Sequence, residues 1–234
     1  MRLLFVRHGQ SESNLARDEG RWLEERDQPL TALGHLQAAR LGEMIAAGAM
    51  VAPDVIYSSL LIRAVETTAG LSRHCAAPIR GHLDLHEVGG PSRGHHARAT
   101  RTSHAGQSRT SLQTLCPGIE LPAQVDETGW YQLGYVESWR QAWQRAQRVT
   151  NWLAERYLDT DKVIAIVAHQ LFLQVMVQVL IDHQPDFDAN WYPGIFKFNN
   201  TGTALAAQPS QWGDPIWFEW INRVDHLTPD QVSY

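Results

Sequence analysis

The chain has 234 residues, of which 44% are hydrophobic and 19% are charged. This composition supports a folded core and excludes disorder as a description of the whole chain, and the length suits one compact α/β unit. The net charge of -5 argues against a nucleic-acid-binding protein. The two cysteines, Cys75 and Cys116, lack a CxxC spacing, which argues against a disulfide scaffold and a zinc ribbon.

Hydropathy along the chain gives no sign of a targeting or membrane segment. The first apolar run, residues 3–6, is too short for the core of a signal peptide. No stretch approaches the roughly 20 apolar residues that span a bilayer. We therefore expect a soluble, cytoplasmic protein without a membrane partner, and we keep a homodimer as a candidate assembly.

The N-terminal half reads as strands alternating with helices. The apolar run over residues 3–6 is typical of a strand buried on both faces, and a polar loop or a helix start follows it. Thr31 is the expected N-cap of a helix whose apolar stripe ends near Gly48. A short strand over 55–57 and a helix over 61–71 come next, and residues 79–86 have the composition of another short strand.

Residues 88–119 form one basic window in this acidic chain. They contain no Asp or Glu and four arginines: Arg93, Arg98, Arg101 and Arg109. Two interpretations stay open, a flexible solvated loop in an arginine-rich chain and a local segment that attracts anions. Because residues 88–130 show no sustained hydrophobic period, we interpret them as an inserted lid or cap.

The C-terminal half continues the alternation. A helix is expected over 139–157, with tryptophans that we assign to packing, and the apolar run over 163–168 is the clearest buried strand. A helix over 171–181 follows, and strands are expected at 196–198, 203–205 and 216–221. This order predicts an α/β fold, a three-layer α/β/α sandwich with a mostly parallel central sheet and an inserted cap segment.

Polar side chains follow three of the predicted strands. Arg7 and His8 end the first, Ser58 and Ser59 end the second, and His169 directly follows the strand over 163–168. Arg63 lies one helical turn after the second. Because parallel strands end at one edge of a sheet, we expect these groups to converge there.

Such a cluster suits phosphoryl chemistry. The guanidinium group of arginine binds two phosphate oxygens through a pair of parallel hydrogen bonds. A neutral imidazole is a nucleophile that carries a covalent phosphoryl group. The leaving oxygen then needs a proton, for which Glu87 is the best candidate because it lies between a strand-like segment and a Gly-Gly turn.

Residues 4–14, LFVRHGQSESN, resemble the signature of the histidine phosphatase superfamily, which includes the cofactor-dependent phosphoglycerate mutases. Residues 27–38 and 57–67 are similar to the next two motifs of the family, and residues 167–169 are similar to its second-histidine motif. The resemblance implies one histidine phosphatase-like domain over 1–234, with a variable cap insertion at about 88–134.

The resemblance also implies a role for each matching residue. His8 would be the phosphohistidine nucleophile, and Glu87 would protonate the leaving oxygen and later activate water. Arg7, Arg63 and His169 would bind and polarise the phosphoryl group. Ser11 and Asn14 would either bind phosphate or cap a helix.

Two departures from the family pattern concern substrate choice. The usual Ser-His-Gly is Ala-His-Gln here, so Gln170 either contacts substrate or fills space. The segment after Glu87 lacks the Tyr-Asp-x-Pro-Pro-Pro run of the mutases, which favours a phosphatase-like branch. In the cap, we favour Arg93 as a ligand for a second anionic group of the substrate.

The sequence therefore predicts a metal-independent phosphatase for small phosphomonoesters, without a cofactor. His95 and His96 could bind a metal ion together with other histidines, but the spacing of these residues matches no known zinc site. A mutase and a non-catalytic regulator that keeps the fold are the alternatives. The sequence names neither the substrate nor the pathway.

Overall fold

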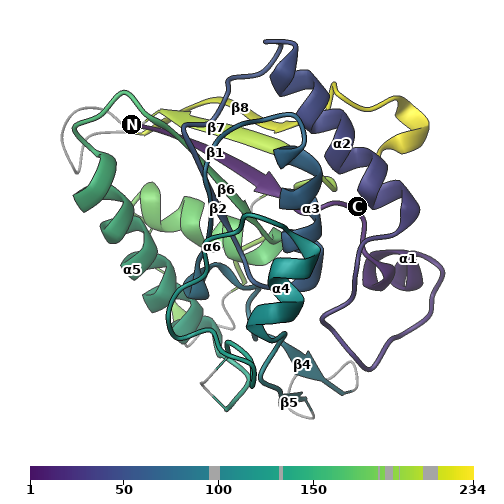
Figure 1. The fold of residues 1–234 in the computed structure, drawn as a ribbon. Coiled ribbons are helices and arrows are strands. Elements are labelled where there is room, and N and C mark those ends of the chain that lie inside the picture. Colours follow the sequence, from purple (N-terminus) through teal and green to yellow (C-terminus); the bar gives the residue numbers. More distant parts are fainter. Residues whose placement is uncertain (95–100, 132–133, 184, 188–191, 195, 208–215) are drawn as a thin grey trace.

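The computed structural model describes residues 1–94, 101–131, 134–183, 185–187, 192–194, 196–207 and 216–234. Its centre is a six-stranded sheet with the order β3-β2-β6-β1-β7-β8 (Figure 1). The strands are β1 (Arg2–Arg7), β2 (Val55–Ser58), β3 (Ile79–Gly81), β6 (Val163–Ala168), β7 (Thr203–Ala207) and β8 (Trp217–Arg223). The first four in spatial order run parallel, and β7 and β8 are antiparallel additions. The mostly parallel sheet is thus confirmed.

Helices cover both faces of this sheet (Figure 1). Helices α2 (Ala32–Ala46) and α3 (Ile62–Ser72) pack on one face, and α5 (Trp139–Tyr157) and α6 (Gln170–Leu180) pack on the other. Alternate residues of β1 supply the two cores: Leu3 and Phe5 face α5 and α6, whereas Leu4 and Val6 face α2 and α3. The three-layer sandwich follows from this two-sided burial. Among the described residues, no helix combines the length and apolar character that a membrane crossing requires.

The segment predicted as a cap packs, in its described part, against the start of α3. A short hairpin of β4 (Ser92–Arg93) and β5 (Thr102–Ser103) is followed by helix α4 (Arg109–Leu115). Leu112, Cys116 and Trp130 of the cap form one apolar cluster with Leu61 and Val65 at the start of α3. In the described part of the cap, the flexible-loop interpretation is therefore wrong. Arg98, His95 and His96 fall outside the described residues.

Two predicted strands differ from the structure. The segment over 79–86 has only three strand residues, and the short 3₁₀ helix Leu83–Leu85 then carries the chain to Glu87. Residues 196–198 are not a strand, because glutamine side chains bind their backbone where a sheet partner would: Phe196 N–H donates to Gln174 Oε1 and Phe198 N–H donates to Gln170 Oε1. Helix α1 (Glu12–Asp18) follows directly on the loop after β1.

A buried ion pair fixes the segment that leads to Glu87. The guanidinium of Arg145, on α5, donates to both carboxylate oxygens of Glu137 at 2.8 and 2.7 Å. It also donates to the carbonyl oxygens of Asp84 and His86 and lies 3.8 Å from the centre of the Phe172 ring. The two charged side chains are 1% and 2% exposed, so each depends on the other for compensation of its charge.

We expect Glu137→Gln to lower the free energy of unfolding by about 3 kcal/mol, because it leaves the Arg145 charge buried and unpaired. Urea denaturation monitored by tryptophan fluorescence measures this change. The matched control is Glu120→Gln, which breaks an exposed pair with Arg80 and is expected to cost less than about 1 kcal/mol. Equal losses in the two variants would contradict the role given to the buried pair.

Candidate active site

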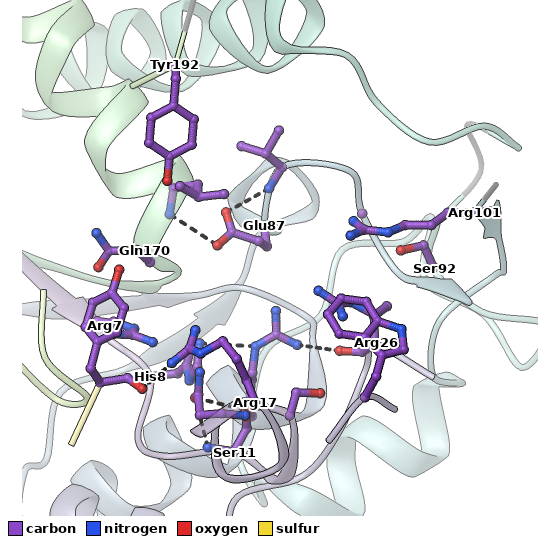
Figure 2. Close-up of a pocket in the computed structure, with 18 residues that line it drawn as sticks. Arg7, His8, Ser11, Arg17, Arg26, Glu87, Ser92, Arg101, Gln170 and Tyr192 are labelled. Atoms are coloured by element: carbon purple, nitrogen blue, oxygen red, sulfur yellow. Dashed lines mark hydrogen bonds between the residues drawn. The ribbon is translucent and has the colours of Figure 1, made fainter. Parts of the chain in front are cut away.

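A cavity of about 290 Å³ opens beside the carboxyl ends of β1 and β6 (Figure 2). Its walls come from β1 and α1, the loop before α2, the start of α3, the cap, the start of α6 and the C-terminal segment. The lining residues are Arg7, His8, Ser11, Ser13, Asn14, Arg17, Trp22, Arg26, Arg63, Glu87, Val88, Gly90, Ser92, Arg101, Gln170, Leu171, Tyr192 and Tyr234. Most of the residues singled out from sequence therefore meet at one site.

His8 lies at the base of this cavity with a defined tautomer. Its Nδ1 is 2.7 Å from the carbonyl oxygen of Gly9, and because a carbonyl only accepts, Nδ1 carries the proton. Its Nε2 accepts a hydrogen bond from Arg63 Nε at 3.2 Å. Burial, and then the charges of Arg63 and Arg7, hold the pKa of His8 well below its usual value. The ring is therefore neutral at neutral pH, with its lone pair on Nε2.

The loop that holds His8 depends on a close approach to helix α2. A Cβ atom at Gly34 would lie 2.1 Å from the carbonyl oxygen of Gln10, so only glycine allows this contact. Thr31 caps the helix, and its hydroxyl also reaches the Gln10 side chain at 2.8 Å. Helix α2 is thereby locked against the residues that follow His8.

Two buried arginines flank His8. Arg7 donates to the carbonyl oxygen of Phe198, its Nε has no partner among the described residues, and burial lowers its pKa to about 10. Arg63 donates to His8 and, through Nη1, to the carbonyl oxygen of Arg26 at 3.1 Å. Both guanidinium groups line the cavity and remain charged at neutral pH, which is an arrangement that suits a bound anion.

Asp27 is the carboxylate nearest to Arg63, with its Oδ1 4.0 Å from Arg63 Nη1. The same oxygen accepts from the N–H of Ile62, the first residue of α3, at 2.8 Å. Burial raises the pKa of Asp27 to about 6. Asp27 begins the family motif over residues 27–38, which predicts no role for it; in the structure it binds the first N–H of α3 and lies near Arg63.

His169 lies next to His8, and the two ring centroids are 5.1 Å apart. Its Nε2 is 2.7 Å from the hydroxyl oxygen of Ser59. Burial, and then the Arg63 charge, keep the pKa of His169 well below its usual value, so this ring is also neutral. Ser59 therefore supports His169 from the end of β2, while Ala168, at the position of the usual serine, is buried and offers no hydroxyl.

Glu87 faces the same cavity from the opposite wall (Figure 2). Its Oε2 accepts from the N–H of Leu171 at 3.1 Å, and its Oε1 accepts from the N–H groups of Phe172 and Val88 at 2.9 and 2.8 Å. Leu171 and Phe172 belong to the first turn of α6, whose N-cap, His169, gives no side-chain cap. Glu87 thus accepts from N–H groups at the start of α6 that have no partner within the helix, and these bonds fix its carboxyl group in the wall of the cavity.

Ser11 and Asn14 form the capping box of α1 and also line the cavity. The Ser11 hydroxyl oxygen accepts from Asn14 N–H at 3.3 Å, and Asn14 Oδ1 accepts from Ser11 N–H at 3.1 Å. Asn200 Nδ2 donates to Asn14 Oδ1 and to the carbonyl oxygen of His8, at 3.2 Å each. The helix-cap interpretation thus describes their contacts, and the cap sits in the wall of the site.

Three glutamines on one face of α6 hold the chain segment opposite. Gln170, Gln174 and Gln178 are spaced by one turn and bind the backbone of Phe198, Phe196 and Pro193. Gln170 also donates to the carbonyl oxygen of Phe196 at 3.2 Å. Its amide is therefore used for this structural contact, which favours the space-filling interpretation over a substrate contact.

Two of the predicted site residues do not line the cavity: His169 is fully buried beside His8, and Arg93 lies away from the site. Its side chain is 65% exposed and pairs with Glu25 at 3.1 Å, and it does not line the cavity. The β4–β5 hairpin accounts for this, because alternate residues point to opposite faces: Ser92 faces the cavity and Arg93 faces away. Arg109 instead donates to the carbonyl oxygens of Val125 and Pro122 within the cap.

Arg17, Arg26 and Tyr234 also line the cavity, although no motif in the sequence predicted them as site residues. The Tyr234 ring lies 4.7 Å from the Arg7 guanidinium and 5.1 Å from that of Arg17, and Arg17 also donates to the Tyr234 carbonyl oxygen. Arg26 directly precedes the family motif that begins at Asp27, and this position was the only signal available. Among the described residues, no group of three or more His, Cys, Asp or Glu side chains has the geometry to hold a metal ion.

The comparison with protein families agrees with this arrangement. The sequence profile of the histidine phosphatase superfamily (branch 1) matches residues 3–201, a range that includes Arg7, His8, Arg63, Glu87 and His169. The chain belongs to the histidine phosphatase superfamily. Curated relatives are named phosphoglycerate mutases: the *Mycobacterium bovis* protein is 34% identical over 53% of this chain and 52% of its own length. Phosphoglycerate mutase 1 of *Saccharomyces cerevisiae* is 44% identical over 28% of this chain and 25% of its own.

Solved structures of this superfamily share the fold over nearly the whole chain. A mycobacterial glucosyl-3-phosphoglycerate phosphatase with bound vanadate has a TM-score of 0.61 and 20% identity, covering 94% of this chain and 98% of its own. A phosphoserine phosphatase from *Entamoeba histolytica* has a TM-score of 0.60 and 20% identity, covering 97% and 99%. The chain spans only about a quarter to a half of the length of these curated relatives.

The buried neutral histidines make stability depend on pH. His8, His86 and His169 stay neutral in the fold because burial lowers their pKa values, whereas in the unfolded chain they gain a proton near pH 6.5. The free energy of unfolding is therefore expected to fall as pH drops from 7 to 5. Asp27 has the opposite effect. Its pKa in the fold is raised to about 6, so the folded chain binds a proton there at a higher pH than the unfolded chain does.

We expect His86→Gln to reduce this pH dependence by about 1.4 kcal/mol per pH unit below pH 6.5, because it removes one histidine from the balance. Urea denaturation at pH 5, 6 and 7 measures the slope of the free energy of unfolding against pH. The contribution of Asp27 is present in every protein compared, so it cancels from the difference between them. His35→Gln, on an exposed position of α2, is the matched control and should leave the slope unchanged. Parallel slopes for wild type and His86→Gln would refute the assignment.

Proposed function

We propose that this protein is a phosphatase that hydrolyses small phosphomonoesters through a phosphohistidine on His8. The observation that carries the proposal is the neutral His8 ring, with its proton on Nδ1 and its lone pair on Nε2, between the Arg7 and Arg63 guanidinium groups. A nucleophile and its anion-binding groups are then in place before substrate arrives, which lowers the cost of reaching the transition state.

In the first step, His8 Nε2 attacks phosphorus in line with the leaving oxygen. The Nε2–P bond forms as the P–O bond to the alcohol breaks, and Glu87, which begins the cycle protonated, gives its proton to that oxygen. Arg63 transfers its hydrogen bond from Nε2 to a phosphoryl oxygen, and Arg7 and His169 contact the other oxygens. In the second step, Glu87 takes a proton from water, which attacks phosphorus and releases phosphate and free His8.

A mutase shares the first step and differs in the fate of the phosphohistidine. The curated relatives named phosphoglycerate mutases support this second candidate, whereas the structural neighbours named phosphatases support hydrolysis. The discriminating measurement is interconversion of phosphoglycerates in the presence of a bisphosphate primer, beside phosphate release from the same compounds. The non-catalytic alternative is the weaker one, because each expected catalytic position carries a competent side chain.

We expect His8→Ala to lower phosphate release from a panel of phosphomonoesters by about a thousandfold or more, because no other group in the cavity replaces the nucleophile. Reactions with ³²P-labelled substrate that are quenched in alkali should label wild type and leave His8→Ala unlabelled, since phosphohistidine survives in base and is hydrolysed in acid. His35→Ala is the matched control and should keep full activity. Full activity of His8→Ala would overturn the assignment, and tight substrate binding without any label would favour the regulator.

Ser59→Ala tests the support of His169. The variant removes the hydroxyl 2.7 Å from His169 Nε2, and we expect kcat to fall about tenfold with a smaller change in KM, because the ring then contacts the transferring phosphoryl group less well. Ser59→Thr keeps the hydroxyl and should recover most of the activity. Equal losses in both variants would show that packing at this position, and not the hydrogen bond, matters.

A further inference from the structure

Two arginines stack on one tryptophan at the far side of the cavity from His8. The guanidinium carbon of Arg26 lies 4.1 Å from the centre of the Trp22 ring, and that of Arg101 lies 6.0 Å from it. Arg26 and Trp22 come from the loop between α1 and α2, whereas Arg101 comes from the cap just before β5. All three line the cavity, and in Figure 2 Arg26 and Arg101 lie across it from Arg7 and His8.

We propose that Arg26 and Arg101, stacked on Trp22, form a second anion site that selects phosphomonoesters carrying another anionic group, a carboxylate or a second phosphate. This inference rests on the proposed function, because it names the class of substrate for the same cavity. Arginine suits the task because its planar fork binds both groups in pairs of hydrogen bonds while its flat face stacks on an aromatic ring.

The backbone holds this second site at a fixed position relative to the first. The carbonyl oxygen of Arg26 accepts from Arg63 Nη1 at 3.1 Å, and the N–H of Arg26 donates to the carbonyl oxygen of Ser92 at 3.0 Å. Trp22 Nε1 donates to the carbonyl oxygen of Gly94 at 3.3 Å. The loop is thus bonded to the phosphate-binding arginine on one side and to the cap on the other.

Charge balance also indicates an anion at this place. Among the residues that the structure describes, no carboxylate lies within ion-pair distance of Arg26. Burial, and then the charges of Arg101 and Arg63, lower the pKa of Arg26 to about 10, so the group is still charged at neutral pH. A partly buried cation that faces other cations is costly unless a ligand compensates it.

Arg93 provides a control within the same part of the chain. It belongs to the same cap hairpin, but it is 65% exposed, pairs with Glu25 and does not line the cavity. Arg93→Gln therefore removes one positive charge from the same part of the molecule without touching the proposed site. It is the matched control for Arg26→Gln and Arg101→Gln.

The experiment measures kcat/KM for three probes of similar size. Glycerol 3-phosphate has no second charge, 3-phosphoglycerate adds a carboxylate, and propane-1,3-diol bisphosphate adds a phosphate. Wild type should prefer at least one of the two acidic probes, and the better of them identifies the second group. We expect Arg26→Gln and Arg101→Gln each to lower the ratio of acidic to neutral kcat/KM by about 10- to 100-fold, whereas Arg93→Gln leaves it within about twofold.

An unchanged ratio in Arg26→Gln, or a loss of the same size on all three probes, would overturn the second site while leaving the phosphatase intact. If wild type releases phosphate from none of the probes, the proposed function fails by itself. Calorimetric binding of 3-phosphoglycerate and glycerol 3-phosphate to the His8→Ala protein then tests the second site without turnover. The same 10- to 100-fold loss of selectivity on adding Arg26→Gln would support it, and equal affinities for the two probes would reject it.

Discussion

The parallel pairing of β1 with β6 is the constraint on which the site depends. Arg7 lies opposite Ala168 in this register, and the N–H of His8 donates to the carbonyl oxygen of Ala168 at 3.0 Å. Two histidines 161 positions apart in the chain are thereby brought to one sheet edge, with ring centroids 5.1 Å apart. Both strands are buried by helices on each face, so a shift in register would expose apolar side chains and is strongly disfavoured.

Burial of cationic groups is the second constraint, and the fold limits its cost in three ways. The histidines are neutral, because desolvation lowers their pKa values. Arg7 donates to a backbone carbonyl, and Arg63 lies near the buried carboxyl of Asp27. The remaining positive charge faces the cavity, where a bound phosphoryl group would compensate it. The overall charge of -5 is therefore no obstacle to an anionic substrate, since the attraction is local.

Helix α6 orders both sides of the site. Its first turn gives N–H groups to Glu87, and its glutamines bind the backbone of the segment between Pro193 and Phe198. That segment in turn supplies the carbonyl oxygen that Arg7 contacts. Glu87 and the backbone that supports Arg7 are therefore both held by one helix, which favours the fixed geometry that the proposed phosphoryl transfer requires.

The sequence by itself determined the buried strands β1, β2 and β6, the helices that follow them, and the cluster of Arg7, His8, Arg63, Glu87 and His169. These come from contiguous apolar runs and local motifs, which a linear pattern records. Only the tertiary structure decided that Arg93 points away while Arg26 lines the cavity, that Ser59 supports His169, and that residues 196–198 bind glutamines in place of a strand. These features depend on a partner residue far along the chain, or on which face of a hairpin a side chain occupies. The neighbouring residues in the sequence determine neither of these.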